Sequence, residues 1–312
     1  MQLIGDIVFD TFPEAAAQQA RTGVIPADPL VTPIADARAQ QDRYFQTLNS
    51  DIPEVAAARD VAVPGPQGRI PIRLVFPTTE APLPCIVFLR GAGFWAGSID
   101  SHARTIHTLA LLSGCAVCAV DYRRTPEFTY PVQRDEVLVV LEWLRENAAS
   151  QGLRADEPVL FGESAGATLG LSAALALRDA RGSLPAGLVL FYINAGGPKA
   201  GGRAYSHWVW SQYVGGADPA SVPGPVPMLQ DMQGLPPCWL ACGEEDPLLE
   251  DTIALAHRLD AASVPHAVVR YPGMPHAFLM HSASLQPALN ALQVAAAAAR
   301  SFFPKLAKDT RS

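Results

Sequence analysis

Short apolar runs that alternate with helical segments most constrain what this chain can fold into. The runs are continuous and do not alternate between apolar and polar residues, which is typical of strands covered on both faces. Five of them lie at residues 84–89, 115–120, 158–162, 188–193 and 238–242. The helical segments between them lie at residues 102–112, 133–148, 167–179 and 252–262. This order predicts an α/β fold with a mostly parallel sheet and right-handed crossovers.

Three further strands complete an expected eight-stranded sheet flanked by helices. Residues 55–63 and 69–76 flank a Pro- and Gly-rich turn and predict an antiparallel hairpin at the sheet edge, and residues 266–271 predict a short last strand. A chain of 312 residues that is 49% hydrophobic is long enough to bury one large core. We therefore expect one core made of residues 51–198 and 235–304, followed by a tail at residues 305–312.

The expected strand at residues 158–162 leads into the motif Gly162-Glu-Ser-Ala-Gly166, and an Ala- and Leu-rich helical stretch follows. A Gly-x-Ser-x-Gly pattern between a strand and a helix is typical of a nucleophile elbow. The sharp turn strains the serine and leaves no room for side chains at the two glycines. The pattern alone is a weak signal, because chance also supplies it. It makes Ser164 a candidate nucleophile that needs a base.

Residues downstream of Ser164 supply a base and an acid in the chain order that some hydrolases use. His276 lies on the loop after the last expected strand and is preferred as the base over His281, which lies in the following helix. Asp246 lies on the loop after residues 238–242 and is preferred as the acid, because Pro247 stiffens that loop where a carboxylate must orient an imidazole. The adjacent alternatives for the acid are Glu244 and Glu245.

These and other motifs make the chain resemble the hormone-sensitive-lipase-like esterases, which are bacterial family IV of the α/β-hydrolase fold. The motifs are Arg90-Gly-Ala-Gly-Phe-Trp-Ala-Gly-Ser98, Asp121-Tyr-Arg-Arg-Thr-Pro-Glu127 followed by Tyr130-Pro131, Gly162-Glu-Ser-Ala-Gly166, Asp246-Pro-Leu248 and His276-Ala-Phe278. The resemblance runs from about residue 57 to residue 304. It implies an α/β-hydrolase fold, ester hydrolysis in two steps through an acyl-enzyme, and a helical cap over the pocket.

The loop at residues 90–93 departs from that family, which usually has His-Gly-Gly-Gly where this chain has Arg90-Gly-Ala-Gly. Such a loop aims backbone N–H groups at the developing oxyanion, and these donors survive side-chain changes if the loop keeps its shape. By position, the donors are expected at Ala92, Gly93 and Ala165, with Ala92 tolerated if its φ is negative or mildly strained. Arg90 either anchors the loop through a new contact or faces the pocket and favours a negatively charged substrate.

Two stretches lie outside the alternation and are expected to form a cap over Ser164. Residues 1–50 carry helical patterning, and residues 199–234 interrupt the run of strands with several aromatic side chains. Binding sites are mostly apolar, so Phe94, Trp95 and Trp210 join Arg90 as candidate pocket residues, with packing inside the cap as the alternative. The chain also has Asn194-Ala-Gly-Gly where the family has a Pro-containing ending, which we expect to reshape the pocket floor.

Composition excludes several other classes of protein. The net charge is −7 and no basic run occurs apart from a mixed tail at residues 305–311, so no nucleic-acid partner is expected. No secretory signal or membrane span is expected, because no basic segment precedes an apolar one at the N-terminus and no apolar run is long enough. No phosphate-binding glycine loop occurs, so neither a cofactor nor a metal is expected. The sequence does not decide the oligomeric state, and a homodimer is a candidate.

Cysteine usage predicts a reducing compartment. The five cysteines all fall in expected core strands, which favours buried reduced thiols and a cytoplasmic location. Cys115 and Cys118 are spaced like a metal or redox pair, but no second pair exists. Positions three apart on a strand point to opposite faces, so core packing is the preferred interpretation of both.

The sequence thus predicts a serine carboxylesterase that acts on small acyl esters through Ser164, His276 and Asp246. An amide or lactone hydrolase, such as an arylformamidase-like enzyme, would use the same triad. A non-hydrolytic small-molecule binder, in which Arg90 has disabled the oxyanion loop, is a more distant alternative.

Overall fold

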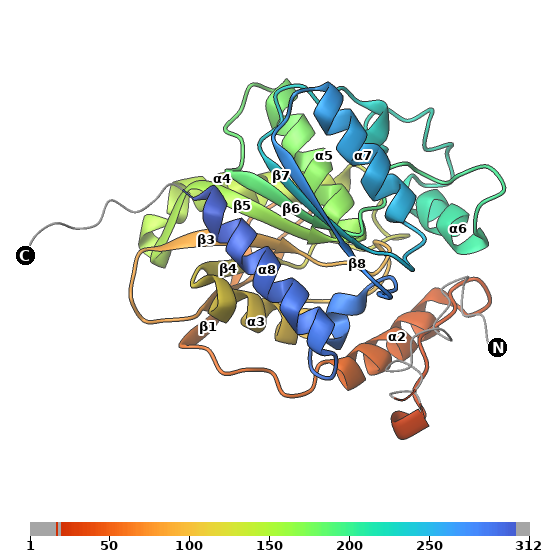
Figure 1. Ribbon diagram of the computed structural model, residues 1–312, viewed down its shortest axis with the longest axis horizontal. Coiled ribbons are helices and arrows are strands. Elements are labelled where there is room, and N and C mark those ends of the chain that lie inside the picture. The colour runs from red at the N-terminus through yellow and green to blue at the C-terminus, as the bar shows by residue number, and fades with distance from the viewer. Residues whose placement is uncertain (1–16, 18–19, 304–312) are drawn as a thin grey trace, which may run out of the picture.

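Eight strands form one sheet in the order β1-β2-β4-β3-β5-β6-β7-β8 (Figure 1), in a computed structural model that describes residue 17 and residues 20–303. β2 pairs antiparallel with β1 and β4, and all other neighbours pair in parallel. The bounds are β1 (Ala57–Val63), β2 (Ile70–Phe76), β3 (Leu83–Leu89), β4 (Ala116–Val120), β5 (Leu153–Glu163), β6 (Gly187–Phe191), β7 (Cys238–Gly243) and β8 (His266–Tyr271). The predicted mostly parallel sheet with an antiparallel edge hairpin is confirmed.

Helices cover both faces of the sheet. α3 (Ala103–Ser113) and α8 (Gln286–Phe302) pack on one face, and α4 (Val132–Asn147), α5 (Ala165–Asp179) and α7 (Leu249–Ala261) pack on the other. Successive residues of β3 point to opposite faces, so Ile86 joins the apolar core under α3 and α8, while Val87 joins the core under α4 and α5. Because both faces are buried, the strands read as continuous apolar runs.

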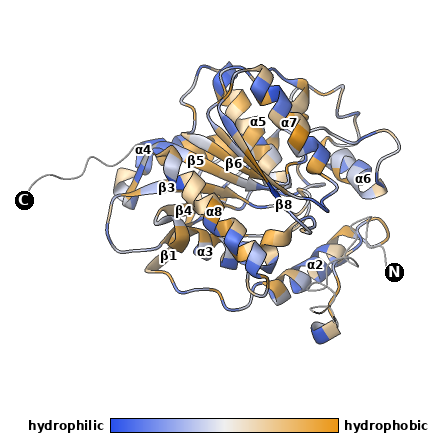
Figure 2. Ribbon diagram, viewed as in Figure 1, coloured by the Kyte–Doolittle hydropathy of each residue, from blue (hydrophilic) through white to orange (hydrophobic). Residues whose placement is uncertain are grey.

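The covering helices carry one apolar stripe each. In α8 the buried residues recur every three or four positions, which places them on one side of the helix. Figure 2 shows both hydrophobic and hydrophilic colours on α7 and α8, as expected for helices with one face on the sheet and one in solvent. α3 ends at Gly114, whose φ of 64° closes the helix in the left-handed conformation.

Two helices lie outside this layered core, α2 (Ile34–Leu48) and α6 (Ala204–Tyr213), and Figure 1 places them at the same end of the molecule. Short 3-10 turns lie at Asp100–His102, Ala149–Gln151, Pro227–Leu229 and Phe278–His281. The parts of the expected cap and tail at residues 1–16, 18–19 and 304–312 lie outside the described residues. Within the described part of the chain, no helix is both long and apolar enough to cross a membrane.

The five cysteines lie buried in the described core as free thiols. Burial raises the pKa of Cys85 and of Cys238 to about 12, which keeps these thiols neutral and unreactive at ordinary pH.

Candidate active site

Ser164 lies in a strained turn between β5 and α5. Its φ of 51° and ψ of −118° fall in a region that residues other than glycine rarely adopt. The turn needs glycine on both sides, since a Cβ on Gly162 would lie 2.5 Å from the Gly166 carbonyl oxygen and one on Gly166 would lie 2.0 Å from the Leu89 carbonyl oxygen. The Ser164 N–H donates to the carbonyl of Phe191 at 2.9 Å, which ties the turn to β6.

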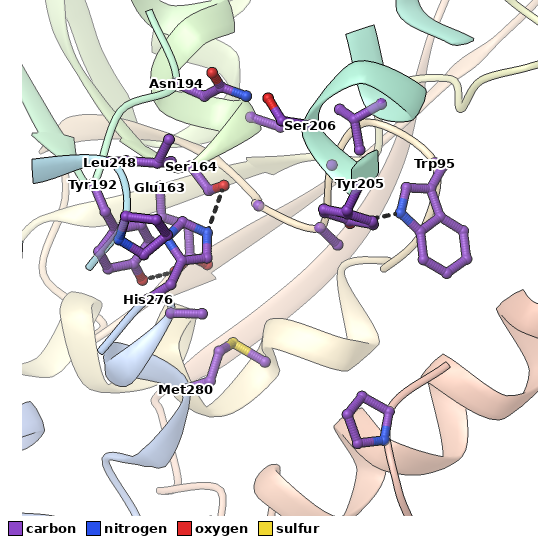
Figure 3. Close-up of a pocket in the computed structure, with 18 of the residues that line it drawn as sticks. Trp95, Glu163, Ser164, Tyr192, Asn194, Tyr205, Ser206, Leu248, His276 and Met280 are labelled. Carbon is purple, nitrogen blue, oxygen red and sulfur yellow. Dashed lines mark hydrogen bonds between the residues drawn. The ribbon is translucent and has the colours of Figure 1, made fainter. Parts of the chain in front are cut away.

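A chain of two hydrogen bonds connects Ser164 to His276 and Asp246. The Ser164 Oγ lies 3.0 Å from the His276 Nε2 (Figure 3), and the His276 Nδ1 lies 2.9 Å from the Asp246 Oδ2. An ionised carboxylate only accepts hydrogen bonds, so Nδ1 carries the proton and Nε2 accepts from the hydroxyl. This is the geometry of a nucleophile, a general base and the acid that orients the base.

The loop after β7 distinguishes the three candidate acids. Asp246 is 5% exposed and its Oδ1 accepts the N–H of Leu248 at 2.8 Å, whereas Glu244 and Glu245 are exposed. His281, the rival base, is buried in the 3-10 turn that follows, and burial lowers its pKa to about 4. The Ser164 hydroxyl bonds to His276, so the geometry brings together the three residues that the sequence favoured.

The loop after β3 lies against the elbow, and its backbone is unusual. Ala92, Gly93 and Phe94 have φ values of 78°, 60° and 64°, so the chain makes a left-handed turn that includes two residues with side chains. Ala92 therefore adopts a positive φ, and not the negative φ under which an alanine is readily tolerated at this position. Ala92, Gly93 and Ala165 all line the cavity that contains Ser164, and no acceptor among the described residues takes their N–H groups. Ala165 is also the first residue of α5, where helix N–H groups have no partner within the helix.

Arg90 anchors this loop and does not line the cavity. Its side chain is buried, and its guanidinium donates to the carbonyls of Ala96 at 2.7 Å and Tyr122 at 2.9 Å. It lies 3.3 Å from a carboxylate oxygen of Asp121 and 4.1 Å from the centre of the Tyr122 ring. The pocket role named for Arg90 is thus corrected in favour of the alternative, an anchor of the loop: its planar guanidinium joins the carbonyl of Ala96 within the loop to that of Tyr122 just after β4, which a histidine could not reach together.

Of the three aromatic candidates for the pocket, only Trp95 lines the cavity. Its indole Nε1 donates to the hydroxyl of Tyr205 on α6 at 2.9 Å. Phe94 is fully buried and stacks on Tyr213, with ring centroids 4.0 Å apart, and Trp210 packs edge-on against Phe94. Phe94 and Trp210 therefore belong to the core of the segment at residues 199–234, which was the alternative interpretation.

The cavity has a volume of about 470 Å³ and contains the Ser164 hydroxyl. One part of its wall comes from α2 and the 3-10 turn after β8, with the side chains of Tyr44, Phe45, Leu48 and Met280. Another part comes from the loop after β6 and from α6, with the side chains of Asn194, Tyr205 and Ser206 (Figure 3) and of Val209. In the described part of the chain no group of three or more metal-ligating side chains comes together.

A buried network beside the nucleophile was missed by the sequence analysis. Glu163 accepts the hydroxyl proton of Tyr192 at 2.6 Å, and its other oxygen lies 3.1 Å from the Nε2 of His102. The Tyr192 ring stands edge-on to the His276 imidazole, with ring centroids 4.9 Å apart. Burial alone would raise the pKa of Glu163, but the hydrogen bonds from His102, Tyr192 and the Gly91 N–H hold that pKa below its ordinary value. The only sequence signal was the Glu before the serine, where the resembled family more often has Asp.

Known proteins resemble this chain in sequence and in fold. A protein family described as alpha/beta hydrolase fold matches residues 86–280. An acetyl esterase of Salmonella agona (strain SL483) is 32% identical over 282 residues, covering 83% of this chain and 86% of the relative. The crystallised ester hydrolase EH1AB1 from the metagenome of Lake Arreo, in complex with a bipyridine phosphonate derivative, has a TM-score of 0.86 and 30% identity over 95% of this chain and 98% of its own. An esterase from the bacterial hormone-sensitive lipase family shares the fold, with a TM-score of 0.81 and 23% identity over 95% and 99% of the two chains.

Proposed function

Because the chain belongs to the alpha/beta hydrolase family, we propose that it is a serine carboxylesterase that hydrolyses short-chain acyl esters. The observation that carries the proposal is the hydrogen-bonded series from Ser164 through His276 to Asp246, at 3.0 and 2.9 Å, with its hydroxyl end in the cavity. The names of the relatives, an acetyl esterase and an ester hydrolase, point to the same reaction.

The geometry supplies each step of an acyl transfer. The His276 Nε2 takes the proton of the Ser164 hydroxyl while the oxygen attacks the ester carbonyl carbon, and Asp246 stabilises the imidazolium that results. The N–H groups of Ala92, Gly93 and Ala165 donate to the carbonyl oxygen as it gains negative charge. The tetrahedral species collapses as the imidazolium gives its proton to the departing alcohol. A water molecule, deprotonated by His276, then releases the acid by the same steps.

The volume of the cavity and the helices that line it favour small substrates. Residues of both α2 and α6 line this cavity of about 470 Å³, which supports the cap that we propose for residues 1–50 and 199–234. We expect faster turnover of a C4 than of a C16 p-nitrophenyl ester. Faster turnover of the C16 ester would contradict an enclosed acyl site.

Removal of the nucleophile tests the proposal directly. We expect Ser164→Ala to lower kcat for p-nitrophenyl acetate or butyrate by about 10⁴-fold or more, and Asp246→Asn to leave a small residual activity, because triad members act as a unit. An organophosphonate probe should label the wild type and not Ser164→Ala. Hydrolysis at the wild-type rate by folded Ser164→Ala would overturn the assignment of the nucleophile.

Cysteine burial and net charge support a proposal for the cellular setting. Five free buried thiols support a cytoplasmic location, and the net charge of −7 argues against a nucleic-acid partner. A homodimer is a proposal that light scattering of the purified chain tests.

A further inference from the structure

Asn194 lies on the loop that follows β6 and lines the cavity next to Ser206 of α6 (Figure 3). Contacts from two helices hold it there. Its backbone carbonyl accepts the hydroxyl proton of Thr168 on α5 at 2.7 Å, and its side-chain Oδ1 accepts the indole N–H of Trp210 at 3.2 Å. Trp210 itself is fully buried between Phe94 and Tyr213, so the indole cannot swing away.

The indole decides which way the Asn194 amide faces. An indole nitrogen only donates hydrogen bonds, so the amide must present its oxygen to Trp210 and its NH₂ group to the opposite side. Figure 3 shows that side facing Ser206 and the cavity. No described group of the protein accepts from the Asn194 Nδ2, and the side chain is half-buried. A preorganised donor without a protein acceptor therefore faces the space that holds the substrate.

We propose that Asn194 is a specificity residue that donates a hydrogen bond to a second oxygen of the substrate, apart from the ester group that reacts. This inference rests on the proposed esterase function. The oxygen is neutral, as in an ether, a hydroxyl or a ketone. The donor is an uncharged amide, and of the two cations on the cavity wall, Lys199 and Arg203, Lys199 is already matched by Glu250 at 2.9 Å and Asp251 at 3.1 Å, which disfavours a substrate carboxylate. The enzyme then prefers esters with this oxygen over alkyl esters of the same length.

Matched ester pairs test the inference, because each pair differs by one CH₂ replaced by oxygen. For the acyl half the pairs are p-nitrophenyl butyrate with methoxyacetate, and pentanoate with 3-methoxypropanoate. For the alcohol half the pair is butyl acetate with 2-methoxyethyl acetate. The quantity measured is the ratio of kcat/KM, ether over alkyl, in the wild type and in Asn194→Leu, which has a similar volume and no donor. Comparing the two proteins cancels the different intrinsic reactivity of the esters.

We expect Asn194→Leu to lower at least one ratio by about threefold to tenfold, the range for one neutral hydrogen bond. The pair that responds identifies the half of the substrate that Asn194 contacts. Asn194→Asp keeps the acceptor for Trp210 and loses the donor, so it should lower the same ratio even if Asn194→Leu folds poorly. Ratios unchanged in both folded variants, with normal wild-type hydrolysis, would overturn this inference alone. Absence of wild-type hydrolysis of every ester would overturn the proposed function instead.

Discussion

Two loops that face each other beside Ser164 are held in shape by opposite means. The elbow at residues 162–166 depends on missing side chains, since a Cβ on either of its glycines would meet backbone atoms at 2.5 Å or less. The loop at residues 90–97 depends on an added side chain, because Arg90 joins the carbonyl of Ala96 within the loop to the carbonyl of Tyr122 outside it. The first requirement is local and leaves a sequence motif, whereas the second is met by contacts between distant segments. Glu163 connects the two loops, because its carboxylate accepts the N–H of Gly91 and also faces His102 in the 3-10 turn that follows the second loop.

The largest effect is expected from a side chain in the elbow. In Gly166→Ala the new Cβ would lie 2.0 Å from the Leu89 carbonyl, which is backbone at the end of a central strand and has no room to move. We expect a loss of more than about 3 kcal/mol in the free energy of unfolding, measured by urea denaturation, or failure to fold.

Gly93→Ala is the matched control in the facing loop. Its φ of 60° is also left-handed, but the new Cβ would meet the side chains of Tyr205 and Trp95 and no backbone. We expect a loss of about 1–2 kcal/mol, the cost of that conformation for an L-residue. Equal stability of the two variants would mean that the elbow is no more restricted than the loop it faces.

Replacing Arg90 is expected to have a smaller effect, which consists of a loss of catalytic rate and a moderate loss of stability. Arg90→Met keeps the apolar stem but leaves the carbonyls of Ala96 and Tyr122 without their donor. The loop then no longer aims Ala92 and Gly93 with the same accuracy. We expect kcat for p-nitrophenyl butyrate to fall by about tenfold to a hundredfold with KM little changed, because oxyanion contacts act mainly in the transition state.

Arg90→Lys keeps the positive charge but cannot bridge the two carbonyls with one planar fork. It should therefore resemble Arg90→Met in kcat. Full activity of Arg90→Lys would show that the positive charge alone holds the loop. Full activity of both folded variants would show that Arg90 does not position the proposed oxyanion donors.

The contrast between the loops also explains which features of the fold and of the site could be predicted from the sequence. Parallel strands end at the same edge of a sheet, so residues just after three strand ends, Ser164, Asp246 and His276, were predicted to meet there. The two-sided burial of the strands was equally visible as continuous apolar runs. Each of these features follows from a short segment and from the order of segments along the chain.

Side chains that act through distant partners were not predictable in this way. Phe94 and Trp210 were expected in the pocket because of their residue type, yet they pack against Tyr213 and each other. Arg90 was left between a loop anchor and a pocket residue, and only its partners Ala96 and Tyr122 decide for the anchor. Nothing around His102 in the sequence marks it as the partner of Glu163. The left-handed backbone of Ala92 likewise depends on the anchored loop and not on its own preference.

Removing the Tyr192 hydroxyl, which lies between Glu163 of the elbow and the base His276, is expected to have a modest effect on kcat. Tyr192→Phe removes the hydroxyl that donates to Glu163 at 2.6 Å but keeps the ring that stands against the His276 imidazole. We expect kcat to fall about threefold to tenfold with KM unchanged, since one hydrogen bond that steadies the ring is lost. Tyr271→Phe is a matched control, because no described group is bonded to its buried hydroxyl. Equal kcat in the two variants would remove Tyr192 from the positioning of the base.

The smallest effect concerns Glu163, which connects the two loops, and the pH dependence of this effect shows only in acid. Hydrogen bonds and charge from His102 hold the pKa of folded Glu163 below its ordinary value of 4.5, against the opposing effect of burial. The unfolded chain therefore takes up this proton first as the pH falls. The stabilisation is complete above pH 4.5 and is lost as the pH drops through the lower pKa of the folded state. A glutamine at position 163 does not titrate, so Glu163→Gln lacks this pH-dependent stabilisation. Its unfolding free energy should therefore fall furthest below that of the wild type at pH 7, and the difference should shrink below pH 4.5. Urea titrations from pH 7 down to acid measure this deficit, and a deficit that stays constant across that range would mean that the two loops are joined by packing and not by the charge of Glu163.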